Sequence, residues 1–283
     1  MKKYVFVSIK AYGDLIILLT ALKNCNYSQS TIIIGSHLVP LIKSLKYEYN
    51  YIVLNIGSEV PAFFDVKVKG IKDGLLSYFE LRGKLDKLMV SHNLINHALI
   101  CDKIRLKEHF LYGKYLVEDV YRPVSNIYKD YADKLNCKYT AKLLPSSDKK
   151  EDWIAVFTES RVKKKNIPDA TLNKIINLLK KFGIKYKIIK ITNKPQVKDS
   201  DYLNVYGFES LNMIIKESKA IVSCDSLPVH LSEYFDTPCF VYLRSWNDYW
   251  LPPSSFLHHQ YDLFDNTQRF ELWAKKLSNM SYV

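Results

Sequence analysis

One stretch, residues 220–243, constrains the fold more than any other part of the chain. It begins with an apolar run at 220–222, breaks at a polar turn, and ends in a second apolar run at 239–243. Pro228 stands where a first helical turn would begin, a position that tolerates its missing N–H. The pattern predicts a strand, a helix and a second strand. The helix start would favour an anion such as phosphate, although a capped helix without a ligand explains the same residues.

Strand-like and helix-like segments alternate along most of the chain, which predicts an α/β fold with parallel sheets. The predicted strands are 4–9, 31–34, 51–56, 98–101, 153–157, 186–191, 203–206, 220–222 and 239–243. The predicted helices are 14–22, 38–45, 75–89, 121–135, 172–182, 211–219, the helix that begins at Pro228, and 271–277.

A polar, lysine-rich segment at 137–152 separates two such series. It contains Pro145, Ser146 and Ser147, residues typical of a linker. We therefore expect two domains, 1–146 and 147–283, each of a size that can hold its own core.

Charge and cysteine content narrow the classes of function. The formal net charge of +12 favours polyanionic partners, namely nucleic acid, an anionic membrane surface or phosphorylated small molecules. No nucleic-acid-binding motif is recognisable, and no apolar run is long enough to span a membrane, so any membrane contact would be peripheral. The five cysteines form no CxxC pair and leave one unpaired. They predict neither a disulfide framework nor a zinc site, and they favour a reducing cytoplasm.

Three motifs follow one another along the chain. Gly13 and Asp14 open the first predicted helix, KNIP at 165–168 precedes a helix of the second half, and CDSLPVHLSEYFDTPCFVYL occupies 224–243. In this order they resemble the Gly-Asp, Lys-x-Trp-Pro and Asp-Ser/Thr-Gly-Pro-x-His motifs of the ADP-heptose lipopolysaccharide heptosyltransferases, glycosyltransferase family 9. The segment 242–253 also resembles a loop of that family.

Three residues depart from the family pattern. Leu227 replaces a glycine and adds a side chain where the donor diphosphate would approach. Ile167 stands at the tryptophan position, and Lys10 lies where small polar residues are commoner.

The resemblance implies a GT-B fold, in which two Rossmann-like domains face each other across a cleft. The first would bind the acceptor and the second the nucleotide sugar. It further implies an inverting transfer that needs no metal or other cofactor, with Asp14 as the base. As an alternative, Asp14 would be a carboxylate that interacts favourably with the positive end of the helix dipole.

The resemblance also implies roles for further residues. Lys165 would stabilise the departing diphosphate, Asp225 would orient the turn as a cap, and Ser226 would bind phosphate oxygens. His230 would contact phosphate or form a hydrogen bond within the core, and Thr158 would reach phosphate or cap the strand end. The implied donor-binding set is Thr158, Lys165, Asp225, Ser226, Leu227, Val229 and His230, with the amides of the last two included. Lys10, Gly13 and Arg161 would act on the acceptor side or in support. Arg161, Lys163 and Lys164 would assist Lys165 or form a solvated loop.

These roles predict a cytoplasmic glycosyltransferase, peripheral on the anionic inner-membrane surface. Its substrates would be a nucleotide sugar carrying heptose or another hexose-like sugar, and a lipid-linked or lipopolysaccharide-type glycan acceptor. Nucleic acid is not an expected partner. The alternative is a non-catalytic protein of the GT-B fold that retains an anion or nucleotide site.

Overall fold

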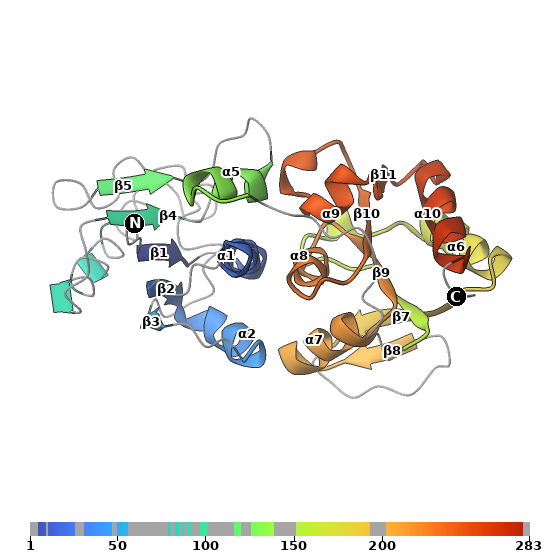
Figure 1. Cartoon of the computed structure of the whole chain (residues 1–283). Helices are drawn as coiled ribbons and strands as arrows, with labels where there is room; N and C mark the ends of the chain where they lie inside the picture. Colours follow the sequence, from blue (N-terminus) through green and yellow to red (C-terminus); the bar gives the residue numbers. More distant parts are fainter. Residues whose placement is uncertain are drawn as a thin grey trace. The chain divides into compact units, whose positions relative to one another are not determined.

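The computed structural model in Figure 1 divides the chain into two compact units, Met1–Tyr139 and Thr140–Val283. It describes residues 5–9, 11–25, 31–46, 50–55, 79, 83–84, 87, 90–91, 97–100, 116–119, 126–138, 151–192 and 202–279. The expected domain boundary at residue 146 and most of the helix expected at 75–89 lie outside these residues.

Unit 1 is built on a sheet of five parallel strands in the order β3-β2-β1-β4-β5. The strands are β1 (Val5–Ser8), β2 (Thr31–Gly35), β3 (Tyr51–Leu54), β4 (His97–Ile100) and β5 (Leu116–Asp119). The main described helices are α1 (Tyr12–Asn24), α2 (Val39–Ser44) and α5 (Ile127–Lys134). Of these elements, β5 was not expected from the sequence.

Helix α1 is buried along most of its length. All eight residues from Leu15 to Leu22 are buried, so this helix has no solvent-facing polar stripe there. It contacts β1 and α5. Its N-cap, Ala11, is extended, and Asp14 lies in the first turn, as the sequence predicts for a strand-to-helix connection.

A disulfide joins the ends of α1 and α5, which corrects the expectation that the cysteines stay unpaired. Asn136 adopts a left-handed conformation (φ 53°) after α5, and the Cys137 N–H donates to the Ala132 carbonyl at 2.9 Å. This turn brings Cys137 to Cys25, the C-cap of α1, with a Cα–Cα distance of 5.6 Å. The partners are 112 residues apart, and spacing along the sequence does not reveal pairing at that distance.

Unit 2 is built on six parallel strands in the order β11-β10-β9-β6-β7-β8. The strands are β6 (Trp153–Phe157), β7 (Lys185–Ile191), β8 (Tyr202–Val205), β9 (Ala220–Cys224), β10 (Cys239–Leu243) and β11 (Tyr261–Leu263). The α-helices are α6 (Asp169–Lys181), α7 (Gly207–Glu217), α8 (Leu227–Tyr234), α9 (Pro253–Leu257) and α10 (Gln268–Asn279). Short 3-10 turns occur at Lys163–Lys165 and Asp248–Trp250.

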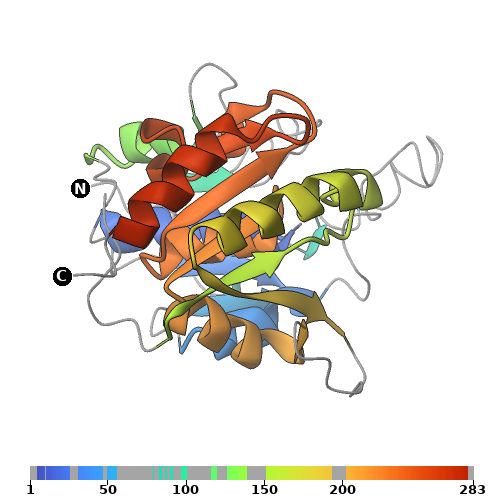
Figure 2. The ribbon, with the colours of Figure 1, turned by 90° about the vertical axis from the view of Figure 1, so that its right-hand side faces the viewer.

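Helices cover both faces of the unit 2 sheet. Figures 1 and 2 show α6 and α10 on one face, and Figure 1 shows α7, α8 and α9 on the other. Every residue of β6, β9 and β10 is accordingly buried, which explains why these strands read as continuous apolar runs. Phe240 and Tyr242 of β10 pack against Phe270 and Trp273 of α10 as an aromatic cluster, with adjacent ring centroids 5.1–5.9 Å apart.

Helix α6 shows how sequence specifies an element in this unit. Thr171, Ile175 and Leu179 are buried at a spacing of four residues and form its inner face. Gly183 follows the C-cap of the helix, and its positive φ of 66° suits a residue without Cβ. The N–H groups of Gly183 and Ile184 donate to the carbonyls of Lys180 and Leu179, so the last turn is closed by hydrogen bonds.

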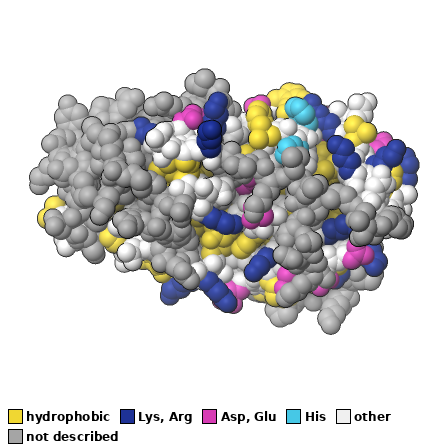
Figure 3. Space-filling view, viewed as in Figure 1, with side chains coloured by type: hydrophobic (Ala, Val, Ile, Leu, Met, Phe, Trp, Pro, Cys, Tyr) yellow, Lys and Arg dark blue, Asp and Glu magenta, His cyan; other side chains and the backbone are white. Residues whose placement is uncertain are grey.

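The strands and helices expected in unit 2 are confirmed, with bounds that differ by a few residues, while β11 and α9 were not expected. Within the described ranges, no helix is long and apolar enough to cross a membrane. On the face shown in Figure 3, the described Lys and Arg side chains lie among Asp and Glu side chains rather than in one continuous basic area.

Reduction of the Cys25–Cys137 disulfide is expected to lower the free energy of unfolding by about 2–4 kcal/mol, because the bond closes a loop of more than a hundred residues. Denaturant unfolding with and without a reductant measures this change. A Cys25→Ser/Cys137→Ser variant should show the lower stability and no response to the reductant. Absence of a Cys25–Cys137 linked peptide from a non-reduced digest would contradict the pairing.

Candidate functional site

The strand order of unit 2 places a crevice at the carboxyl ends of its central strands. The first strand, β6, lies in the middle, with β7 on one side and β9 on the other, so the chain changes direction between β6 and β9. Phe157 pairs with Ser223, which brings the carboxyl ends of both strands to the same edge. In open α/β sheets, ligands bind outside the carboxyl ends of strands at this switch in order.

The loop that follows β6 is fixed at both ends. The Ile167 N–H donates to the Thr158 carbonyl at 2.9 Å, and the Ser160 N–H donates to Asn166 Oδ1 at 2.8 Å. The Ile167 side chain is buried in the core of unit 2 and so anchors the loop. These contacts hold the 3-10 turn Lys163–Lys165, which carries three consecutive lysines.

The turn that follows β9 is organised by Ser226. Ser226 is the N-cap of α8, and its hydroxyl donates back to the Cys224 carbonyl at 3.1 Å. The expected role of Asp225 as the cap is therefore corrected, because Asp225 stands one residue before the cap. The Val229 N–H, expected to face a phosphate, donates to the Ser226 carbonyl at 3.1 Å and is engaged within the first turn.

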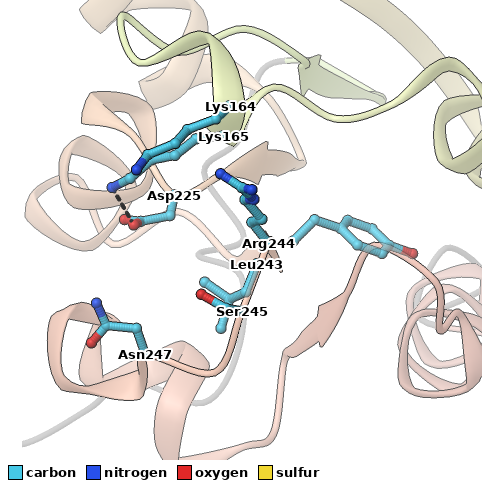
Figure 4. A pocket seen from close by; sticks show the side chains of 8 residues that line it. Lys164, Lys165, Asp225, Leu243, Arg244, Ser245 and Asn247 are labelled. Carbon is cyan, nitrogen blue, oxygen red and sulfur yellow. Dashed lines mark hydrogen bonds and ion pairs between the residues drawn. The ribbon is translucent and has the colours of Figure 1, made fainter.

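An ion pair connects the two loops. Lys165 Nζ donates to Asp225 Oδ2 at 2.6 Å, across 60 residues of sequence. The Lys165 side chain is 39% exposed and that of Asp225 is 17% exposed, so both remain accessible from solvent. Figure 4 shows Lys164 running beside Lys165, with both amines close to the Asp225 carboxylate.

A pocket of about 350 Å³ opens at this ion pair. Figure 4 shows the side chains that line it, including that of Arg244, which points toward the lysines. The lining residues are Lys164, Lys165, Asp225, Tyr242, Leu243, Arg244, Ser245 and Asn247. They come from the last residues of β10 and from the loops after β6, β9 and β10, three neighbouring strands.

Burial determines the protonation of two groups beside the pocket. His230 is buried in α8, and this burial lowers its pKa from 6.5 to about 4, so the imidazole is neutral at pH 7. Burial likewise raises the pKa of the Cys224 thiol to about 11, so this thiol remains protonated. A buried, neutral His230 supplies no positive charge to an anion.

The pocket brings together some of the predicted site residues and not others. Lys165 and Asp225 line it, as does the possible helper Lys164, whereas the remaining donor-site candidates do not. Arg161 is exposed and lies outside the lining, and Leu227 is partly buried as the first residue of α8. Gly13 and Asp14 lie in the first turn of α1 in unit 1, and Lys10 lies outside the described residues.

Arg244, Ser245 and Asn247 were not predicted as site residues. They follow β10, the strand adjacent to β9, and the strand order alone brings them to the pocket. A sequence signal was present, because Arg244 follows a buried apolar strand directly, as Asp225 does.

No protein-family model matches the sequence, and no curated protein sequence matches it. The structure is nevertheless similar to solved glycosyltransferases. ADP-heptose lipopolysaccharide heptosyltransferase II of E. coli superposes with a TM-score of 0.62 at 13% identity, over 100% of both chains. The chain has the GT-B fold.

Two further structures support this assignment of the fold. E. coli heptosyltransferase WaaC with ADP-2-deoxy-2-fluoro heptose gives a TM-score of 0.56 at 14% identity, over 98% of this chain and 100% of that one. A glycosyltransferase of family 9 from Veillonella parvula gives 0.56 at 12% identity, over 93% of this chain and 86% of that one. These identities establish the fold alone, so the activity rests on the site.

The buried His230 is expected to make the protein less stable in acid. Its pKa is about 4 when folded and about 6.5 when unfolded, so the unfolded chain takes up a proton first as the pH falls. The contribution is present above pH 6.5 and is lost between pH 6.5 and 4. Between pH 7 and pH 5 the loss should be about 2 kcal/mol.

The unfolding free energies of the wild type and His230→Gln, measured at both pH values, test this expectation. The variant should lose about 2 kcal/mol less than the wild type on acidification, whatever its stability at pH 7. Equal losses would show that His230 does not carry the depressed pKa.

Proposed function

We propose that this protein is an inverting glycosyltransferase that needs no metal. It transfers heptose or another hexose-like sugar from a nucleoside diphosphate donor to a lipopolysaccharide or related surface-glycan acceptor. The observation that carries the proposal is the positively charged pocket at the switch in strand order of unit 2. The similarity of the fold to WaaC, whose solved structure contains an ADP-sugar, supports the assignment of this pocket to the donor.

Lys165 binds the donor diphosphate in this proposal. Its amine pairs with Asp225, and the phosphate oxygens of a bound donor compete for the same N–H groups. The partial exposure of both side chains keeps the cost of this exchange small. When the sugar leaves, the positive side chains stabilise the charge that develops on the diphosphate.

Asp14 is the proposed base. The acceptor hydroxyl attacks the anomeric carbon, its proton passes to the Asp14 carboxylate, and the bond from that carbon to the diphosphate oxygen breaks. Lys10 and Gly13, from the same strand-to-helix connection, belong to the acceptor side. Thr158, Ser226, Leu227 and the start of α8 supply the remaining donor contacts, and Arg161 assists.

The proposed acceptor is lipid-linked, and the enzyme acts at the inner membrane surface, with which its contact is peripheral. The net charge of +12 draws the protein to anionic lipid headgroups and to a phosphorylated acceptor.

Substitution of Asp14 separates binding from transfer. Asp14→Asn should keep donor binding, seen as a rise in melting temperature with one class of ADP-, UDP-, GDP- or dTDP-sugar. It should lower the rate of sugar transfer by about 100-fold or more, because it removes the proton acceptor. Transfer by the wild type should continue in the presence of a chelator.

Asp169→Asn is the matched control, because Asp169 is also a first-turn carboxylate, in α6 of unit 2. It removes the same favourable interaction with a helix dipole and should leave transfer unchanged. Substantial turnover by Asp14→Asn would eliminate Asp14 as the base. Absence of stabilisation of the wild type by every donor would overturn the proposed function and favour the non-catalytic alternative.

A further inference from the structure

The charges that line the unit 2 pocket do not balance. Lys164, Lys165 and Arg244 are positive, and Asp225 is negative. Asp225 already pairs with Lys165 at 2.6 Å. Among the described residues, no acidic side chain lies within ion-pair distance of Lys164 or Arg244. The pocket therefore presents two positive charges that its own residues do not neutralise.

Arg244 holds a defined place in this pocket. It is the first residue after β10, whose Tyr242 pairs with Cys224 of β9. Cys224 is the last residue of β9, so Arg244 follows β10 close to the turn at Asp225, with which it lines the pocket. In Figure 4 its guanidinium points toward Lys164 and Lys165. Arg244 thus reaches the pocket from the β10 side, and the two lysines reach it from the β6 side.

We propose that Arg244 binds the diphosphate of the donor. This inference rests on the proposed function. It adds a phosphate-binding residue that the sequence motifs do not contain. Each phosphate of a nucleoside diphosphate sugar carries a negative charge. Lys164, Lys165, Arg244 and Asp225 together carry a net charge of about +2, which matches these two charges, and Lys165 shares its N–H groups between Asp225 and the phosphate oxygens.

The chemistry of arginine suits this role. Its guanidinium is always protonated and presents a planar fork of donors that binds two phosphate oxygens at once, whereas lysine acts as a point charge. Ser245 and Asn247, on the same loop, add neutral hydrogen-bonding groups to the pocket wall. Arg244 therefore fixes the orientation of the diphosphate, and Lys164 contributes charge.

Calorimetric titration of Arg244→Met and Arg244→Lys tests the inference. The probes are ADP, UDP, GDP and dTDP, each compared with its monophosphate. For whichever diphosphate binds the wild type, Arg244→Met should weaken binding about 10- to 100-fold, the range for a lost charged hydrogen bond. The loss should be smaller for the monophosphate, and Arg244→Lys should recover part of it.

The control variant is Lys174→Met, which removes one exposed positive charge from α6. It should change the affinity by less than about threefold, because exposed distant charges are screened. An equal loss in Arg244→Met and Lys174→Met, or no loss in Arg244→Met, would overturn the role of Arg244 while leaving the proposed function intact. Failure of all four diphosphates to bind the wild type would overturn the proposed function itself.

Discussion

The Lys165–Asp225 ion pair joins the two loops on which the candidate site depends. A partly exposed pair of this kind contributes little to stability, about 1 kcal/mol, so its importance lies in geometry rather than in the energy of folding. One partner follows β6 and the other follows β9, and the loops themselves are held by Ile167 and Ser226. The pair therefore holds together the two loops that border a crevice created by the strand order.

The architecture could be predicted from the sequence because its main elements have a clear apolar pattern. Strands β6, β9 and β10 are buried on both faces and read as apolar runs, and α6 carries buried residues at a spacing of four. Short elements gave no such signal. Strand β11 has three residues and α9 has five, so neither presents a full period of its pattern.

The site could be predicted in part, for an equally physical reason. Lys165 and Asp225 belong to sequence motifs. Asp225 directly follows a recognisable strand, and Lys165 lies in the loop after another. Arg244 reaches the same pocket because β10 adjoins β9, and this adjacency depends on strand order. The Cys25–Cys137 disulfide depends on a tertiary contact, and the neutral state of His230 depends on burial. Neither can be predicted from the local sequence pattern.

The central claim is that the Lys165–Asp225 pocket binds the donor diphosphate, with Lys165 as the attracting charge. The most direct test is the affinity of Lys165→Met and Asp225→Asn for the nucleoside diphosphate that binds the wild type, at constant ionic strength. Lys165→Met should bind at least about tenfold more weakly, since it loses a charged hydrogen bond. Asp225→Asn should bind as tightly as the wild type or more tightly, because it releases Lys165. An unchanged affinity in Lys165→Met would contradict the account.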